Sequence, residues 1–446
     1  MGMGVEMAER EMASKVEVVE SGFVVPSERT PKQEICLSNL DIWYCRYYTP
    51  TVYVYGPNGD PNFFSVEAMK AALGKALVPF YPLAGRLGVN RDGRLEIQCT
   101  GEGVLFVVAR SEFTLRDFKD FTPSTDVRPL LVPPMESVEP PCILIMFQVT
   151  FLKCGGVCLG VNLHHSVADG PGSIHFINTF SDIARGVGLT APPFLNRTLL
   201  RPRSPPTVLF DHVEYLCQPS NDPLKAAIPL NEPVILKVSR DQLDSLKNRG
   251  TGNRSGLSTF KALSAHLWRC ACKARDLPSV RVTRLHISID ARNRLQPPLP
   301  PTYFGNAAFR KAVVATAGEV VSDPLDHLAG KIHDAAVRSN DEFFRSLIDS
   351  LEQVNMRRMH ISAWALPGTD LYAVSWLRMP IYDADFGWGK PVFMGTATSR
   401  SPCGMVHIMR SPGDDGGISV VASLEAENMP RFKKLFYEGL TGVESA

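Results

Sequence analysis

The stretch from Cys142 to Ala184 limits the possible folds more than any other part of this 446-residue sequence. Apolar residues dominate 142–153 and 157–163, with a Gly-Gly pair between the two runs. Such runs are typical of buried strands, so we predict two strands joined by a turn. A polar loop, HHSVADG, follows at 164–170, and Pro171 stands where a helix can begin. The apolar residues of that helix recur at helical spacing, at Ile174, Ile177, Phe180, Ile183 and Ala184.

The rest of the chain alternates between strand-like and helix-like segments, which indicates an α/β (α+β) fold. Segments rich in Val, Ile and aromatic residues predict strands at 40–55, 94–98, 286–290, 373–377 and 418–424. Helical periodicity predicts helices at 66–77, 259–276, 329–351 and 429–438, and Ser258 is the expected N-cap of the second.

Prolines mark a boundary between two halves of the chain. Five prolines fall within 191–207, at Pro192, Pro193, Pro202, Pro205 and Pro206, and this composition is typical of a linker. We therefore expect a disordered leader at 1–20, an N-terminal domain at 21–190, a crossover linker at 191–222 and a C-terminal domain at 223–446.

Charge and composition exclude several classes of function. The formal net charge is +1, so we expect a small-molecule partner rather than nucleic acid or an acidic membrane. The longest apolar stretch is far shorter than the ~20 residues of a membrane helix, and residues 1–20 lack a signal peptide. The ten cysteines are scattered and lack the spacing of zinc sites. The sequence predicts a cytoplasmic protein with free thiols and no metal.

The HHSVADG loop carries the residues best suited to chemistry. Loops on a rigid scaffold often hold active groups, and an imidazole titrates near working pH. An imidazole of this loop is therefore a natural general base for acyl transfer, in which an attacking hydroxyl or amine must lose a proton. Asp169, four residues after His165, can hold the loop in shape through a cation elsewhere in the chain.

The residues alone leave other interpretations of this loop open. Two adjacent histidines can bind a metal, although no third ligand lies near them in the sequence. They can also be ordinary loop residues. A Ser-His-Asp hydrolase would need a G-x-S-x-G motif, which the sequence lacks, and no cysteine has the context of a nucleophile.

A second unusual segment, DADFGWGKP, spans 383–391. Gly387 and Gly389 flank Trp388, and the pattern is typical of a tight turn with a packed aromatic residue. In that interpretation Asp385 and the glycines are structural. Trp388 could also face a site, because an indole offers an N–H donor on a large apolar body.

Together the two segments resemble the signature motifs of the BAHD acyltransferases, in the order and separation of that family. Within the family, the chain is most similar to hydroxycinnamoyl-CoA:shikimate or quinate hydroxycinnamoyltransferases. Further similar stretches are ALVPFYPLAGRL at 76–87, DARNRLQPPLPPTYFGN at 290–306 and SWLRMPIYDADFGWGKP at 375–391. The resemblance implies two similar chloramphenicol-acetyltransferase-like domains, joined by a crossover linker, with an active-site channel between them.

The resemblance also implies roles for the loop residues and their partners. His165 is the expected base, in the middle of the channel. Asp169 is expected to point away from the substrates and to pair with an arginine of the DARNR run, Arg292 or Arg294.

Other residues take implied roles around the reacting groups. Thr49 and Trp388 are expected to stabilise the tetrahedral intermediate. Ser258 and Thr259 are expected near the CoA-binding end of the channel. Asp385 is expected to be structural and distant from the chemistry.

Three positions differ from the shikimate and quinate enzymes, and all three fall on the acceptor side. Those enzymes have His where this chain has Tyr48, Thr where it has Val374, and an acceptor-binding Arg where an ungapped alignment places Ile361. An aliphatic side chain cannot form the bidentate carboxylate contact of an arginine. Arg357 and Arg358 lie one helical turn away and could substitute for it.

The sequence thus predicts transfer of a p-coumaroyl, caffeoyl or feruloyl group from CoA to a small hydroxyl or amine acceptor. No cofactor is expected, since acyl-CoA is a co-substrate, and the protein is expected to be a monomer. The alternatives are an N-acyltransferase for an arylamine or polyamine, a thioester hydrolase, and a catalytically silent family member that acts as a protein partner.

Overall fold

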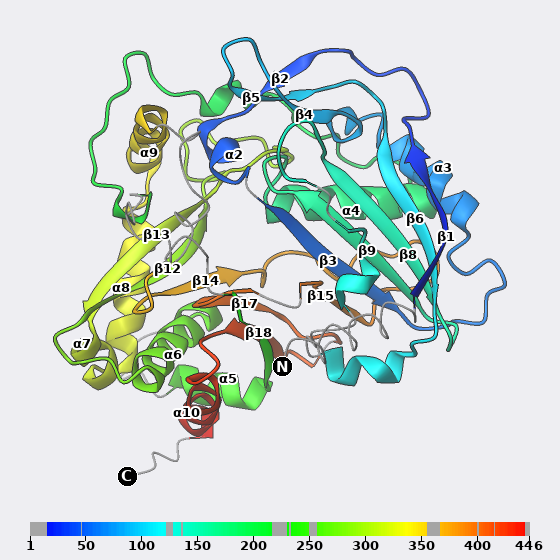
Figure 1. Cartoon of the computed structure of the whole chain (residues 1–446). Helices are drawn as coiled ribbons and strands as arrows, with labels where there is room; N and C mark the ends of the chain where they lie inside the picture. The colour runs from blue at the N-terminus through cyan, green and yellow to red at the C-terminus, as the bar shows by residue number, and fades with distance from the viewer. Residues whose placement is uncertain are drawn as a thin grey trace, which may run out of the picture. The chain divides into compact units, whose positions relative to one another are not determined.

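The structure is a computed structural model, which describes residues 16–45, 47–121, 128–134, 137–215, 230–231, 233–248, 257–354, 366–398, 401–413 and 415–441. The chain forms two compact units (Figure 1). The first contains residues 1–202, 299–307 and 379–399, and the second contains 203–298, 308–378 and 400–446. The first unit therefore includes two segments from the half of the sequence that was predicted as one contiguous C-terminal domain.

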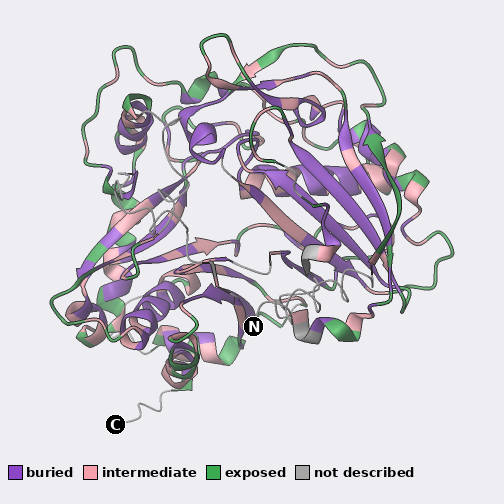
Figure 2. Ribbon diagram, viewed as in Figure 1, coloured by how far each residue is buried: buried purple, intermediate pink, exposed green. Residues whose placement is uncertain are grey.

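The first unit is built on a six-stranded mixed sheet in the order β1-β6-β8-β9-β3-β15. Its neighbouring strands are antiparallel except β6 and β8, which are parallel. Most residues of β8 and all residues of β9 are buried, which agrees with the near-continuous apolar runs of their sequences (Figure 2). The strands are β1 (Val16–Val24), β6 (Val104–Ser111), β8 (Ile145–Leu152), β9 (Val157–His164), β3 (Tyr48–Tyr55) and β15 (Phe393–Thr396).

Helix α4 (Gly170–Ala184) packs on one face of this sheet, beside α3 (Val66–Ala76). Asp169 is its N-cap, and Pro171 lies in its first turn. Phe176 and Phe180 contact Phe147 of β8, with ring centroids 6.3 and 5.8 Å apart. Burying one such ring contributes about 1.5–3 kcal/mol. This packing holds the start of α4, and the loop before it, against the end of β9.

A four-stranded antiparallel sheet, β2-β5-β4-β7, also belongs to the first unit. The five residues of helix α2 (Asn39–Trp43) are all buried, and Ser38 and Asp41 form a capping box at its start. The strands are β2 (Glu34–Cys36), β5 (Leu95–Gln98), β4 (Arg86–Val89) and β7 (Cys142–Ile143). Short 3₁₀ helices are η1 (Tyr81–Ala84), η2 (Leu115–Phe121), η3 (Arg128–Leu131) and η4 (Arg197–Leu200).

The second unit has its own six-stranded sheet, in the order β11-β18-β17-β14-β12-β13. Trp268 of α6 is fully buried and donates from its indole N–H to Thr283 Oγ1 of β12 at 3.0 Å. The strands are β11 (Val234–Val238), β18 (Ile418–Ser423), β17 (Met405–Arg410), β14 (Leu371–Ser375), β12 (Val282–Asp290) and β13 (Ala308–Thr316), with a short pair β10 (Leu230–Asn231) and β16 (Ser401–Pro402). The helices are η5 (Val213–Tyr215), α5 (Arg240–Asn248), α6 (Thr259–Ala274), α7 (Ala317–Ser322), α8 (Leu325–Arg338), α9 (Asp341–Gln353) and α10 (Met429–Thr441).

Three predictions of secondary structure from the sequence were wrong. Residues 40–43 belong to a helix, α2, and the strand starts only at Tyr48. The predicted helix 329–351 is two helices, because Asn340 starts a new one as an N-cap and the apolar spacing hides this break. Residues 16–20 form part of β1, which pairs with β6, rather than a disordered leader.

In the described part of the chain, no helix has both the length and the apolar character needed to cross a membrane.

Candidate active site

The HHSVADG loop starts where two central strands of the first unit end. Tyr48 pairs with His164 in the β3–β9 ladder, and the His165 amide donates to the Tyr47 carbonyl at 3.0 Å. His165 thus continues the ladder by one residue. Opposed residues of an antiparallel pair share a face, which makes Thr49 and His165 diagonal neighbours about 7 Å apart.

The imidazole of His165 lies against two tyrosine rings. The Tyr44 ring stacks on it, with centroids 4.5 Å apart and planes at 19°, and the Tyr47 ring meets it edge-on at 5.0 Å. The buried Nδ1 atom has no hydrogen-bond partner among the described residues. Burial lowers the pKa of His165, while the Asp169 and Asp41 carboxylates oppose this effect. A neutral imidazole with an unbonded nitrogen can accept a proton, as a general base must.

The neighbouring His164 has a different environment. Its side chain is fully buried, its Nδ1 lies 2.7 Å from Ser166 Oγ, and its ring meets Tyr48 edge-on at 4.8 Å. Burial lowers the pKa of His164 to about 4. His164 also has one nitrogen, Nε2, without a hydrogen-bond partner among the described residues, but its side chain is fully buried whereas His165 is partly exposed. His164 is therefore a neutral, packed residue of the framework, and His165 is the better candidate for a base.

Asp169 fixes the other end of the loop. Its carboxylate accepts from the Gly172 amide at 3.2 Å, which caps α4, and from the Ala307 amide at 2.9 Å. Both contacts lie within the first unit. The predicted ion pair with Arg292 or Arg294 would join the two units and stays a prediction.

Comparison with known proteins shows which family the chain belongs to. A model described as the Transferase family matches residues 14–439. The chain belongs to this family, the BAHD acyltransferases. It is 45% identical to shikimate O-hydroxycinnamoyltransferase of Nicotiana tabacum over 435 residues, which cover 95% of this chain and 100% of the relative. It is 46% identical to putrescine hydroxycinnamoyltransferase 1 of Oryza sativa subsp. japonica over 447 residues, which cover 95% and 99%.

A solved structure from outside this group of relatives has the same fold. Vinorine synthase matches with a TM-score of 0.69 at 23% identity, over 93% of this chain and 96% of that chain. At this identity the likeness shows the fold alone. The predicted fold class, with two sheet-based domains, is confirmed, and family membership identifies the chain as an acyltransferase.

Trp388, in the DADFGWGKP segment, lies far from the loop. Its ring contacts Phe64 with centroids 5.1 Å apart, and Phe64 contacts Tyr55 at 4.6 Å. Tyr55 ends β3, whereas Thr49 stands near its start, and six residues of strand span about 20 Å. The predicted pair of Thr49 and Trp388 around the reacting carbonyl does not form, and Trp388 is a packing residue.

The rest of this segment lies at the C-terminal end of α4. A Cβ atom added at Gly387 would lie 3.4 Å from the Cβ of Arg185, which follows the helix. Asp169 caps the start of the helix, about 22 Å away. Asp385 accepts from the Gly387 and Gly389 amides at 2.8 and 3.0 Å. The two glycines have φ of 100° and 105°, which favours glycine. Asp385 therefore shapes a turn, as the sequence predicts.

The residues predicted to bind the acceptor and CoA lie on several different elements of the structure. The Tyr48 hydroxyl donates to the Ile143 carbonyl at 2.5 Å. Val374 lies in β14, Ser258 caps α6, and Thr259 begins that helix. Their substrate-binding roles, and the implied channel, stay predictions. The remaining three, Arg357, Arg358 and Ile361, lie outside the described residues.

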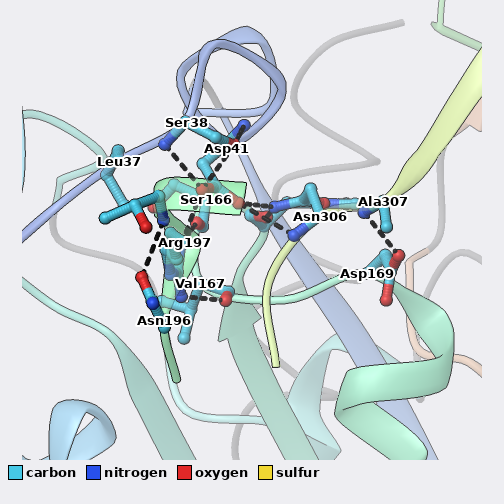
Figure 3. A network of polar contacts seen from close by, with 12 residues as sticks. Leu37, Ser38, Asp41, Ser166, Val167, Asp169, Asn196, Arg197, Asn306 and Ala307 are labelled. Atoms are coloured by element: carbon cyan, nitrogen blue, oxygen red, sulfur yellow. Dashed lines mark hydrogen bonds and ion pairs between the residues drawn. The ribbon is translucent and has the colours of Figure 1, made fainter. Parts of the chain in front are cut away.

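Sequence reasoning missed four residues around the loop: Tyr44, Asp41, Arg197 and Asn306. Asn306 donates from its side chain to the His165 carbonyl at 2.8 Å and to Asp41 at 2.9 Å. Arg197 pairs with Asp41 at 2.9 Å (Figure 3). Only Asp41 had a local signal, the Ser-x-x-Asp pattern of a capping box.

Proposed function

We propose that this chain transfers a hydroxycinnamoyl group from coenzyme A to a small alcohol or amine, with His165 as the general base. The His165 ring carries the proposal, because it is a neutral imidazole that is partly exposed and can meet a substrate, whereas the His164 ring is 0% exposed. The names of the two relatives support the acyl group. One name specifies transfer to oxygen and the other an amine substrate, so acceptors of both kinds occur among relatives.

The proposed reaction uses acyl-CoA as co-substrate and no further cofactor. The imidazole removes a proton from the acceptor as its oxygen or nitrogen attacks the thioester carbonyl. The tetrahedral intermediate then collapses, its C–S bond breaks, and the imidazolium returns the proton to the CoA sulfur. The products are CoA thiol and an ester or amide, and no residue of the chain is acylated.

Thr49 is the proposed donor to the oxyanion of this intermediate. Its Oγ1 is buried without a hydrogen-bond partner in the described part of the chain, and Thr49 shares a sheet face with His165. An unmade hydrogen bond in a buried site costs about 1–3 kcal/mol, so a hydroxyl that is satisfied only in the intermediate would favour that state.

The test is release of free CoA from p-coumaroyl-CoA, with and without shikimate, quinate, putrescine or tryptamine. We expect acceptor-dependent release by the wild type, a loss of about 10²–10⁴-fold in kcat for His165→Ala, and a smaller loss for His164→Ala. Release without an acceptor would instead indicate hydrolysis. No release at all would indicate a protein partner. A larger effect of His164→Ala would show that His165 is not the base.

A further inference from the structure

Three consecutive carbonyls that follow the His165 ring are held by buried side chains. The His165 carbonyl accepts from Asn306 Nδ2 at 2.8 Å. The Ser166 carbonyl accepts from Arg197 Nη1 at 3.1 Å, and the Val167 carbonyl accepts from Arg197 Nη2 at 2.6 Å. The guanidinium thus spans two successive peptide groups, and its planar fork fixes both at once.

One carboxylate orients both of these donors. Asp41 Oδ2 lies 2.9 Å from Arg197 Nη1, and Asp41 Oδ1 accepts from the side chain and backbone N–H of Asn306 at 2.9 and 2.8 Å. Asp41 and Asn306 are 0% exposed and Arg197 is 4% exposed. Figure 3 shows the three side chains converging on the loop from separate segments of the first unit.

A gain in stability is a weak explanation for the buried ion pair of Arg197 and Asp41. A buried ion pair often contributes no more than well-packed apolar residues of the same size, because both charges lose their hydration. By binding the Ser166 and Val167 carbonyls, Arg197 fixes the orientation of the backbone that follows His165. The ring on that backbone is then held between Tyr44 and Tyr47.

We propose that Arg197 is a positioning residue for His165. Arg197 holds the two peptide groups after the base, and Asp41 fixes the guanidinium, so that the imidazole meets the acceptor proton at one distance and angle. The proposal rests on the proposed role of His165. It assigns a catalytic consequence to a residue of the proline-rich segment, which the sequence predicted to be a linker.

Arg197→Lys tests this proposal, because lysine keeps the charge beside Asp41 but lacks the fork that spans two carbonyls. Arg275 offers a matched control. Its side chain is 4% exposed, pairs with Glu425 at 3.0 Å and donates to the Asp370 carbonyl, all in the second unit. Arg275→Lys therefore removes a similar buried fork that does not contact the loop.

We expect both variants to lose thermal stability. Only Arg197→Lys should lower kcat per folded molecule, by about ten- to a hundredfold, as expected when a reacting group is misplaced by an ångström or less. KM for both substrates should stay close to wild type, since the loss lies in the chemical step. Equal kcat per folded molecule in the two variants would overturn the proposal.

A second variant keeps the test decisive if Arg197→Lys does not fold. The double substitution Asp41→Asn with Arg197→Gln leaves no buried charge unpaired, and the same loss in kcat is expected. Wild-type kcat in a folded double variant would overturn the proposal. His165→Ala is measured in the same assay. An active His165→Ala enzyme would contradict the base itself, whereas an inactive one beside unaffected Arg197 variants would contradict only the positioning role.

Discussion

The rings of Tyr44 and His165 lie nearly parallel, with centroids 4.5 Å apart and planes at 19°. Tyr44 is itself buried and shields one face of the imidazole from water. Burial is the main cause of the lowered pKa of His165. The stack therefore connects the orientation of the proposed base with its protonation state.

Tyr44→Ala is expected to raise the pKa of His165, because water then reaches the imidazole and stabilises its charged form. The base acts when neutral, so the acidic limb of the kcat/KM profile should move to higher pH. Tyr44→Phe keeps the stacked ring and should leave this limb in place. If the limb is the same in wild type and Tyr44→Ala, the stack does not control the protonation of His165.

Trp388→Phe is expected to lower the melting temperature and to leave kcat per folded molecule near the wild-type value. The indole packs on Phe64 at the end of β3 that is distant from the loop, and a phenyl ring retains part of that contact. A donor to the oxyanion would behave differently, since its removal typically costs about 10²–10³-fold in kcat. Steady-state rates beside thermal melts separate the two outcomes.

The position of the HHSVADG loop could be predicted from the sequence because its signals are local. Apolar runs mark β8 and β9, and Pro171 after a polar loop marks the start of α4. The same reasoning failed for α2, where Ile42, Trp43 and Tyr44 favour strands by propensity. The capping box of Ser38 and Asp41 favours a helix at this point and outweighs that preference.

The network around the loop could not be predicted, because its contacts join distant segments. Arg197 is 31 residues from Ser166, and Asn306 is 265 residues from Asp41. A basic residue between prolines has the pattern of a solvated linker, and nothing nearby in the sequence shows that its charge is buried. Likewise, the DADFGWGKP segment gave no sign that Trp388 lies near one end of α4 while the loop lies at the other end.

Acid is expected to destabilise the fold through His164. Its pKa is about 4 in the folded protein and 6.5 in an unconstrained histidine. The unfolded chain therefore binds the extra proton between these values, so stability is retained above pH 6.5 and lost as the pH falls. Lowering the pH from about 7 to about 5 should cost about 2 kcal/mol through this residue.

His164→Gln removes the titrating group and should reduce the loss of unfolding free energy over this range by that amount. The other histidines are common to both proteins, and of these His165 is the one whose charge lowers the pKa of His164. Urea unfolding at the two pH values measures the difference. Equal losses in the two proteins would show that another group causes the acid sensitivity.

Poor use of a carboxylate acceptor is expected from the three positions that differ from the shikimate and quinate enzymes. The resemblance places Ile361 at the position of their acceptor-binding arginine, and Tyr48 and Val374 at the positions of polar residues. Loss of one charged contact costs ~1.5–3 kcal/mol, which is roughly ten- to a hundredfold in affinity. The ratio of kcat/KM for shikimate to that for putrescine should therefore lie below one.

Ile361→Arg should raise this ratio by about the same factor, whereas Ile361→Met, an uncharged change of similar size, should not. A wild-type ratio well above one would contradict the prediction. A low ratio that Ile361→Arg fails to raise would show that a different residue, such as Arg357 or Arg358, occupies the aligned position.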